Sequence, residues 1–461
     1  MRRPSPARML PPLPRLRRAA AGFAAMGTLA AAAGGAAAQE MPAGSPGSPL
    51  FTAGISQGFT VDSNFRLQDR DPGTTSFADT RVELGVISET RLQTLSLGLD
   101  TGLRALWQPD QDFEFTFASP STARGDYLRE WSSGSLDVGL RYRQTSVDAD
   151  RPLSDFIDPD TGEIDNPDDL NRLTSDVTER RYDGTLDLAL ATDSPSSYEF
   201  SLVATRFDYD QVTSDTTPRT NFTGEALWRL RFTPVLSGAV LGSYDYFDSD
   251  NDRDTLVRNA DIDVGFIYEP DASLRLDFGV GYANYERRET ERPNSDDPVR
   301  RSIEENGAVA RAGLRYAFED VTLSGEARYS RATDGAPFTG NLRAIYPLPR
   351  GTLTGRVFQN KTGSSTGNQV RVTGVGFGLD HALDARSGLS FDASAARQVD
   401  ETAPFEADTT RYAFSASYAR DVTAAVAGRI GYRFRSFDQE PESATSNAVF
   451  LEIGRSFSSR P

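Results

Sequence analysis

The sequence of 461 residues contains no cysteine and only one histidine, His381. The absence of cysteine excludes disulfides, thiolate nucleophiles and cysteine-ligated metal centres. A single histidine excludes any site that needs two imidazoles and argues against a histidine-based catalytic triad. Phosphate-binding loops and the G-x-S-x-G motif of serine hydrolases are also missing. We therefore expect no enzymatic activity, no metal ion and no cofactor.

Basic charge is scarce relative to acidic charge. The sequence has 49 Lys and Arg against 66 Asp and Glu, for a formal net charge of −17. Nucleic-acid binding requires a basic surface, so nucleic acid is not an expected partner. The hydrophobic fraction of 38% is low for a soluble domain, but aromatic residues reach 10%. That aromatic content argues against wholesale disorder.

The N-terminus has the composition of an export signal. Residues 2–18 contain six arginines and no acid, an Ala/Gly-rich stretch begins at Ala19, and three alanines occupy residues 36–38. This order predicts a secretory signal peptide over residues 1–38, with a short flexible lead-in over residues 39–50. The alternative is a transmembrane anchor, which the Ala and Gly content disfavours. No later run of 18 apolar residues exists, so no membrane-spanning helix is expected there.

The rest of the chain alternates between apolar and polar residues. A typical segment is residues 95–107, where Leu95, Leu97 and Leu99 alternate with serine, glycine and aspartate. A period of two places the apolar residues on one face of a β-strand and the polar residues on the other. No comparable helical periodicity is present. We therefore predict an all-β chain.

The connections between the predicted strands are of two alternating kinds. Nine short turns interleave with ten longer, acidic loops, so both ends of the strand array lie on the short-turn side. Short periplasmic turns, long outer loops and an even strand count are typical of outer-membrane barrels. We predict a single closed antiparallel transmembrane β-barrel of about 20 strands over residues 51–457, with a C-terminal tail at 458–461. Eighteen strands is the alternative, if residues 51–61 and 126–131 are misread.

Aromatic residues gather near both ends of the predicted strands, as they do at the two interfaces of a membrane. The set near the short turns is Trp131, Phe232, Tyr268, Phe318 and Tyr346, and the set near the long loops is Trp107, Tyr246, Tyr285, Tyr329 and Phe437. Hydrocarbon tolerates no open sheet edge, which also favours closure. These features favour a membrane barrel over a soluble β-sandwich, propeller or solenoid. The expected location is the cell outer membrane, with lipid and lipopolysaccharide as partners.

The polar face of the strands would line a lumen too wide for its own side chains to fill. The predicted pore-lining residues are Arg229, Arg231, Arg275, Arg311, Arg315, Arg343, Arg356, Arg429, Arg433, Arg435, Asp261, Asp263 and Asp277. Further acids on this face include Asp137, Asp187 and Glu225. Rings of arginine favour anions, and facing acidic and basic rows set a transverse field. The alternative is that the two signs only neutralise each other on a wet wall.

Two other features have weaker interpretations. The loop at residues 148–178 is rich in carboxylates that could bind calcium, but its spacing departs from the EF-hand pattern. The single histidine, His381, is expected on the lipid-facing side of a strand at the short-turn rim. It is therefore interpreted as an interfacial residue, not as a base.

The sequences of the predicted strands resemble those of bacterial outer-membrane porin-like barrels, in particular the β-barrel porin 2 type. The resemblance rests on the D-x-G-L-R-Y-R segment at residues 137–143 and on Gly279-Val280-Gly281-Tyr282. The last strand resembles the C-terminal signal read by the barrel assembly machinery, since four apolar residues share one face. These are Val449, Leu451, Ile453 and Phe457. Arg455 interrupts that face, and four residues follow Phe457. The resemblance implies a location and an assembly partner, but no particular substrate.

These observations predict an outer-membrane channel that passes small polar or charged solutes. One alternative is a conduit that exports an anionic polysaccharide along the arginine rows. Another is a closed structural or adhesion barrel that acts through its outer loops. The sequence leaves the oligomeric state open.

Overall fold

The computed structural model describes residues 48–67, 73–109, 113–117, 120–146, 177–211, 217–250, 254–291, 299–318, 320–332, 338–363, 369–400, 408–439 and 442–459. Every regular element in this part of the chain is a β-strand, and the 21 strands form one sheet. None of the described residues belongs to a helix long and apolar enough to cross a membrane. The predicted signal peptide lies outside the described residues.

The strands are β1 (Leu50–Asp62), β2 (Thr75–Glu89), β3 (Gln93–Trp107), β4 (Glu114–Phe117), β5 (Ser121–Trp131), β6 (Gly134–Ser146), β7 (Thr178–Leu190), β8 (Ser196–Tyr209), β9 (Arg219–Arg231), β10 (Leu236–Ser249), β11 (Thr255–Tyr268), β12 (Leu274–Glu291), β13 (Val299–Phe318), β14 (Val321–Ser330), β15 (Phe338–Leu348), β16 (Gly351–Gly363), β17 (Gln369–Asp384), β18 (Ser387–Asp400), β19 (Asp408–Asp421), β20 (Val426–Gln439) and β21 (Glu442–Ser459).

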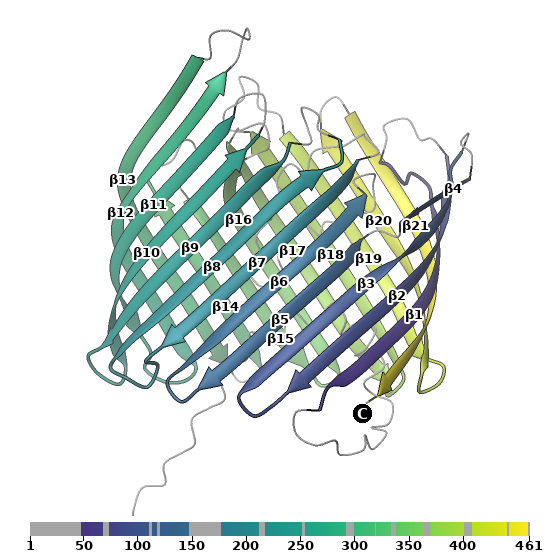
Figure 1. The fold of residues 1–461 in the computed structure, drawn as a ribbon, viewed down its shortest axis with the longest axis horizontal. Coiled ribbons are helices and arrows are strands. Elements are labelled where there is room, and N and C mark those ends of the chain that lie inside the picture. The colour runs from purple at the N-terminus through teal and green to yellow at the C-terminus, as the bar shows by residue number, and fades with distance from the viewer. Residues whose placement is uncertain are drawn as a thin grey trace, which may run out of the picture.

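Antiparallel pairing between the first and last strands closes the sheet into a barrel (Figure 1). The β1–β21 register runs from Phe51 opposite Ser459 to Asp62 opposite Ala448. The predicted closed antiparallel barrel of 20 strands is therefore confirmed. Residues 51–61 lie in β1 and residues 126–131 lie in β5, so the alternative count of eighteen is wrong.

The twenty-first strand, β4, is a short piece that the sequence did not predict. It pairs with the upper part of β3, between Leu103 and Leu106, while β5 pairs with the lower part. Strand β4 thus continues the position of β5 toward the long-loop rim. Its segment contains the exposed rings of Phe115 and Phe117. Phe113, just before it, packs against Trp107 with the rings tilted and a centroid distance of 5.0 Å. These rings form an aromatic group at the rim.

The turns and loops segregate as predicted. Nine connections of two to five residues lie at one rim, where β1 begins and β21 ends, and most connections at the other rim are longer. The exception is the predicted long loop at residues 438–446, most of which belongs to β20 and β21, because Gln439 pairs with Glu442. The β11–β12 turn shows how a short turn is held. The carboxylate of Asp271 accepts hydrogen bonds from the backbone N–H groups of Ser273 and Leu274 at 2.8 and 3.1 Å. Together with the Ser273 hydroxyl, they hold the pKa of Asp271 below its usual range.

The outer face of the barrel is an apolar band. On β12, alternate residues from Leu274 through Val280 to Tyr282 point outward, and the next outward residue is Asn284. Val280 is 69% exposed. Nine residues span roughly 26 Å along the strand, or about 20 Å in height at a tilt near 40°, close to the apolar band of a transmembrane barrel. No other described part of the chain covers these outward apolar side chains. Such a surface is suited to the hydrocarbon of a membrane.

Strands β12 and β13 are the exception to an even rim. They contain 18 and 20 residues, and Figure 1 shows their hairpin rising above its neighbours. The pairing of β13 with β14 covers only Val309 to Phe318. Above Ala308, β13 therefore pairs with β12 alone among the described strands.

Two members of the predicted aromatic girdle lie on the wrong side. Tyr285 and Phe437 are buried on the inner wall, at 3% and 1% exposure, and do not face lipid. Tyr285 shares the parity of Arg275 and Asp277 on β12, opposite to that of Val280. Nearness to a strand end suggested the assignment, whereas the period of two determines the face.

Apolar groups also occupy parts of the inner wall toward the long-loop rim, which the sequence did not predict. Three buried clusters are Phe65 with Phe77 and Leu106, Val177 with Phe207 and Tyr209, and Ala283 with Tyr285, Val309 and Ala332. The inner face is thus polar at mid-height and partly apolar near that rim.

Candidate functional site

All thirteen predicted pore-lining residues lie on the inner face of the barrel. Within the apolar band, each has the parity opposite to the outward apolar residues of its strand, such as Trp228 on β9 or Ile430 on β20. The structure further sorts these residues into rows, because the register of neighbouring strands determines which side chains stand beside one another.

Four arginines form one row across five strands, the arginine row. Arg275 on β12 stands opposite Arg315 on β13, and Arg343 on β15 stands opposite Arg356 on β16. Ser324 on β14 links the two pairs in the same register. With strands about 4.8 Å apart, the row spans roughly 19 Å of the wall.

The charges of the arginine row are only partly compensated. Arg275 pairs with Asp277 at 3.1 Å, but Arg315 and Arg356 form no ion pair within the part of the chain that the structure describes. Like charges directly opposite each other in a sheet are unfavourable. The row therefore concentrates positive potential on one part of the wall, where an anion would relieve the repulsion.

Four carboxylates form a second row, the acid row, on a different part of the wall. In continuous register from β6 to β11 stand Asp137, Asp187, Ser201, Glu225, Ser243 and Asp261. Hydroxyl groups thus alternate with carboxylates over the second half of the row. Of its acids, only Asp261 belongs to the thirteen predicted residues.

An ion cluster occupies the wall between β10 and β14. Arg311 on β13 approaches Asp263 on β11 at 3.4 Å, and Arg328 on β14 forms an ion pair with Asp261 on β11. Both arginines reach over β12, which presents glycine at this level. A Cβ atom on Gly279 would stand 2.5 Å from Oδ1 of Asp263, so only glycine permits this approach. The cluster neutralises one end of the acid row.

Arg435 has a different environment from the other predicted arginines. It donates to Oδ2 of Asp62 at 2.7 Å and to the carbonyl of Phe65 at 3.1 Å, while Ser446 donates to Asp62 at 2.6 Å. Arg435 and Asp62 have only 4% and 3% of their side chains exposed. This arginine therefore joins β20 to β1 across β21 and does not face open lumen.

Arg429 and Arg433 flank an inward-facing aromatic ring that the sequence analysis did not assign to the lumen. Their guanidinium carbons lie 5.5 and 5.9 Å from the ring centroid of Phe450 on β21. A Cβ atom on Gly431 would meet this ring at 2.3 Å, so the ring lies over that glycine. The parity of Phe450, opposite to Val449 and Leu451, was the signal that could have placed it.

The remaining predicted residues lie near the short-turn rim or outside the described residues. Arg229 forms an ion pair with Glu269 and donates to the Ser237 hydroxyl at 2.9 Å, while Arg231 lies one inward position further down β9. His381 stands opposite Gly351 near that rim, at a lipid-facing position of β17. The acidic loop proposed for calcium lies almost entirely outside the described residues. No group of three or more potential metal ligands occurs among the described ones.

Comparisons with known proteins give a distant structural similarity only. No family model matches the chain, and no curated protein matches it. The chain is similar to the ferric-catecholate import receptor Fiu from E. coli K12 in its open form, at 10% identity over 90% of this chain and 82% of that chain, with a TM-score of 0.48. For the siderophore receptor PiuA from Acinetobacter baumannii, the identity is 9% over 87% and 82%, with a TM-score of 0.46. For the copper transporter OprC, it is 10% over 89% and 80%, with a TM-score of 0.44. Values this low assign no substrate and no mechanism to this chain.

Proposed function

We propose that the chain is an outer-membrane, porin-like channel that passes small polar or charged solutes and has no enzymatic role. Export through a cleaved signal peptide over residues 1–38 belongs to the same proposal. The observation that carries it is the separation of the arginine row and the acid row on the inner wall of a closed barrel with an apolar outer face. Separated rows of opposite sign set a field across a wet lumen. Such a field would orient dipolar and charged solutes in transit.

Conductance of the folded barrel in a planar bilayer tests the proposal. The wild-type barrel should conduct ions, and its reversal potential in a salt gradient reports the selectivity. Replacing Arg315, Arg343 and Arg356 by Gln should shift selectivity toward cations, because the row that gathers anions is lost. Replacing Asp187 by Asn and Glu225 by Gln should shift it toward anions.

The control is Arg206→Gln, which removes an exposed arginine on the outer face of β8 and should leave selectivity unchanged. Heat-dependent migration on a gel establishes that each variant is folded. Folded wild-type barrel that never conducts would contradict the proposal.

The continuity of the arginine row favours a second candidate, an export conduit for an anionic polysaccharide. The four arginines of the arginine row could bind successive carboxylates of a polymer as it moves from one strand to the next. In that case the triple arginine variant should abolish surface polysaccharide in cells, with the barrel still present. Normal surface polysaccharide in those cells would leave the solute channel as the better account.

A further inference from the structure

At the centre of the arginine row, a serine stands between two arginines. Ser324 on β14 lies opposite Arg315 on β13 and opposite Arg343 on β15. Because neighbouring strands are about 4.8 Å apart, the two arginines flank Ser324 at a separation of about 10 Å. Their long side chains can both reach a small ligand above the serine hydroxyl. The register thus places two guanidinium groups and one hydroxyl around a single point of the lumen wall.

These groups are accessible from the lumen. Arg315 is exposed, and Arg343 and Ser324 are partly exposed. Within the described part of the chain, Arg315 forms no ion pair and the Ser324 hydroxyl forms no hydrogen bond. Arg356 on β16 stands opposite Arg343 and adds a third positive charge beside the same point. An anion that enters the lumen can therefore meet hydrogen-bond donors here that have no carboxylate bound to them.

One carboxylate belongs to the same surface. Glu326 is the next inward residue after Ser324 on β14, about 7 Å along the strand, and its side chain is exposed. The register places it diagonally from both Arg315 and Arg343. It forms no ion pair with any described residue. Since an ionised carboxylate only accepts hydrogen bonds, the surface combines several donors with one acceptor.

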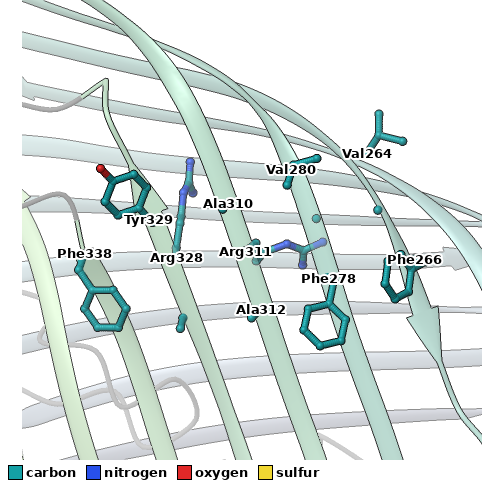
Figure 2. Close-up of a pocket in the computed structure, with 13 residues that line it drawn as sticks. Val264, Phe266, Phe278, Val280, Ala310, Arg311, Ala312, Arg328, Tyr329 and Phe338 are labelled. Carbon is teal, nitrogen blue, oxygen red and sulfur yellow. The ribbon is translucent and has the colours of Figure 1, made fainter.

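Another pair of opposed arginines on the same wall lacks this combination. Arg311 on β13 and Arg328 on β14 lie side by side, and Figure 2 shows Arg311 extending toward the strand of Phe278. Arg311 approaches Asp263 at 3.4 Å, and Arg328 forms an ion pair with Asp261. The charges of this pair are thus compensated within the wall. Opposed arginines alone do not make an anion site, and the surface around Ser324 differs by its unpaired donors.

Donors beside one acceptor discriminate among small anions. Guanidinium groups bind tetrahedral oxyanions through parallel charge-assisted hydrogen bonds, and a dianion balances two of these groups. The dianion of inorganic phosphate keeps one O–H, which can donate to a carboxylate. Sulfate and the dianion of a phosphate monoester have no such O–H, so a carboxylate beside them only repels. The arrangement therefore favours inorganic phosphate.

We propose that Arg315, Ser324, Arg343 and Glu326 form a binding site for inorganic phosphate on the lumen wall. The two guanidinium groups and the serine hydroxyl donate to the phosphate oxygens, and the phosphate O–H donates to the Glu326 carboxylate. The inference rests on the proposed function and deepens it, because it names the solute that the arginine row gathers. Ser324 is the fourth residue of β14 from the short-turn rim, which is the periplasmic end in a barrel of this type.

Phosphorus NMR of inorganic phosphate, titrated with the full folded barrel in detergent, tests the site. Binding broadens the phosphate signal, so the line width reports occupancy independently of conduction. Arg315→Gln and Arg343→Gln should each weaken binding about tenfold, because a charge-assisted contact is lost. Ser324→Ala should weaken it about threefold, because one neutral hydrogen bond is lost.

Competition by sulfate and by methyl phosphate tests the role of Glu326. At mildly alkaline pH neither competitor has an O–H to donate, so neither should displace phosphate from the wild-type barrel at equal concentration. In Glu326→Gln, both should compete as well as unlabelled phosphate does, because the amide can donate to any oxyanion. A merely structural role of Glu326 would not change this order of anions.

The matched control is Arg124→Gln, which removes an inner-wall arginine on β5, opposite Gly98 and away from this site. It should bind phosphate as the wild type does, and heat-dependent migration on a gel establishes that each variant is folded. No broadening by the wild type, or equal broadening by Arg315→Gln and Arg343→Gln, would overturn the inference. Displacement of phosphate from the wild type by sulfate or methyl phosphate would also overturn it. Conductance of the same preparations reports separately on the proposed function, since a barrel that conducts without binding phosphate contradicts only the site.

Discussion

A few buried residues connect the first and last strands of the barrel, where the sheet closes. Arg435 and Asp62 come from strands that are 373 residues apart in the sequence. Removal of one partner of a buried ion pair leaves the other charge uncompensated in a poorly hydrated site. The ion pair therefore links β20 to β1, on either side of β21, the strand that closes the sheet.

Replacement of Asp62 by Ala should destabilise the barrel by about 3 kcal/mol, because the buried guanidinium of Arg435 then loses the carboxylate of this ion pair. Urea unfolding in lipid vesicles, followed by tryptophan fluorescence, measures the loss. Replacement of Arg206 by Ala is the control, since its pair with Asp208 is 60% and 31% exposed and should contribute less than about 1 kcal/mol. Equal losses of unfolding free energy in the two variants would mean that the buried Arg435–Asp62 pair contributes no more than an exposed pair.

Close packing on the inner wall gives a second prediction about single residues. A Cβ atom on Gly374 would stand 2.2 Å from Cζ of Phe358, whose side chain is almost fully buried. Gly374→Ala should therefore force the ring aside and cost about 1–3 kcal/mol in the same unfolding measurement. Gly355→Ala on the neighbouring strand meets no atom within 4 Å and should be neutral. A neutral Gly374→Ala would show that the ring moves freely.

Among the elements, the last strand has a role beyond its pairing. We propose that Val449, Leu451, Ile453 and Phe457 of β21 form the signal for the barrel assembly machinery. All four are about half exposed on the outer face. Arg455 interrupts this face and lies 4.8 Å from the ring of Phe457, so the two side chains cover each other.

Phe457→Ala should lower the amount of folded barrel in the outer membrane severalfold, with little change in the stability of barrel refolded in vitro. Quantitative gels of membrane fractions measure the first effect and urea unfolding the second. The control is Phe318→Ala, since Phe318 is also outward, near the short-turn rim and half exposed, but lies on β13. If both variants assemble equally well, Phe457 is only a lipid-facing residue.

The elements also show which part of the fold the sequence determines locally. Alternation identified nearly every strand, because the face of a residue depends only on its parity along one strand. Register is different: the placement of Arg343 opposite Arg356, and of Asp187 opposite Asp137, depends on pairing between strands. The arginine row and the acid row could therefore be anticipated in composition but not in order. Strand β4 was missed because four residues are too few for a periodic signal.

For the whole molecule, the apolar band defines how the barrel would sit in a membrane. Val280→Arg would place a charge in the band and should cost about 2–4 kcal/mol in lipid vesicles. Ser302→Arg, on the β12–β13 hairpin above the rim, should cost less than about 1 kcal/mol. Unfolding midpoints of the two variants in vesicles measure the difference. Equal tolerance of both charges would instead fit a soluble β-protein.

Closure of the ring between β1 and β21 also imposes an order in time. Ser446 and Asp62, which meet at the closure, are separated by 384 residues. Bringing together the ends of a chain that long costs about 5 kcal/mol of entropy, and contacts so remote in sequence form slowly. The final strand is also the last of the barrel strands to be synthesised. Until it arrives, the other strands have two bare edges, each able to pair with any extended chain nearby. The long interval before closure is therefore the period in which the unclosed barrel most needs a chaperone that covers its two strand edges.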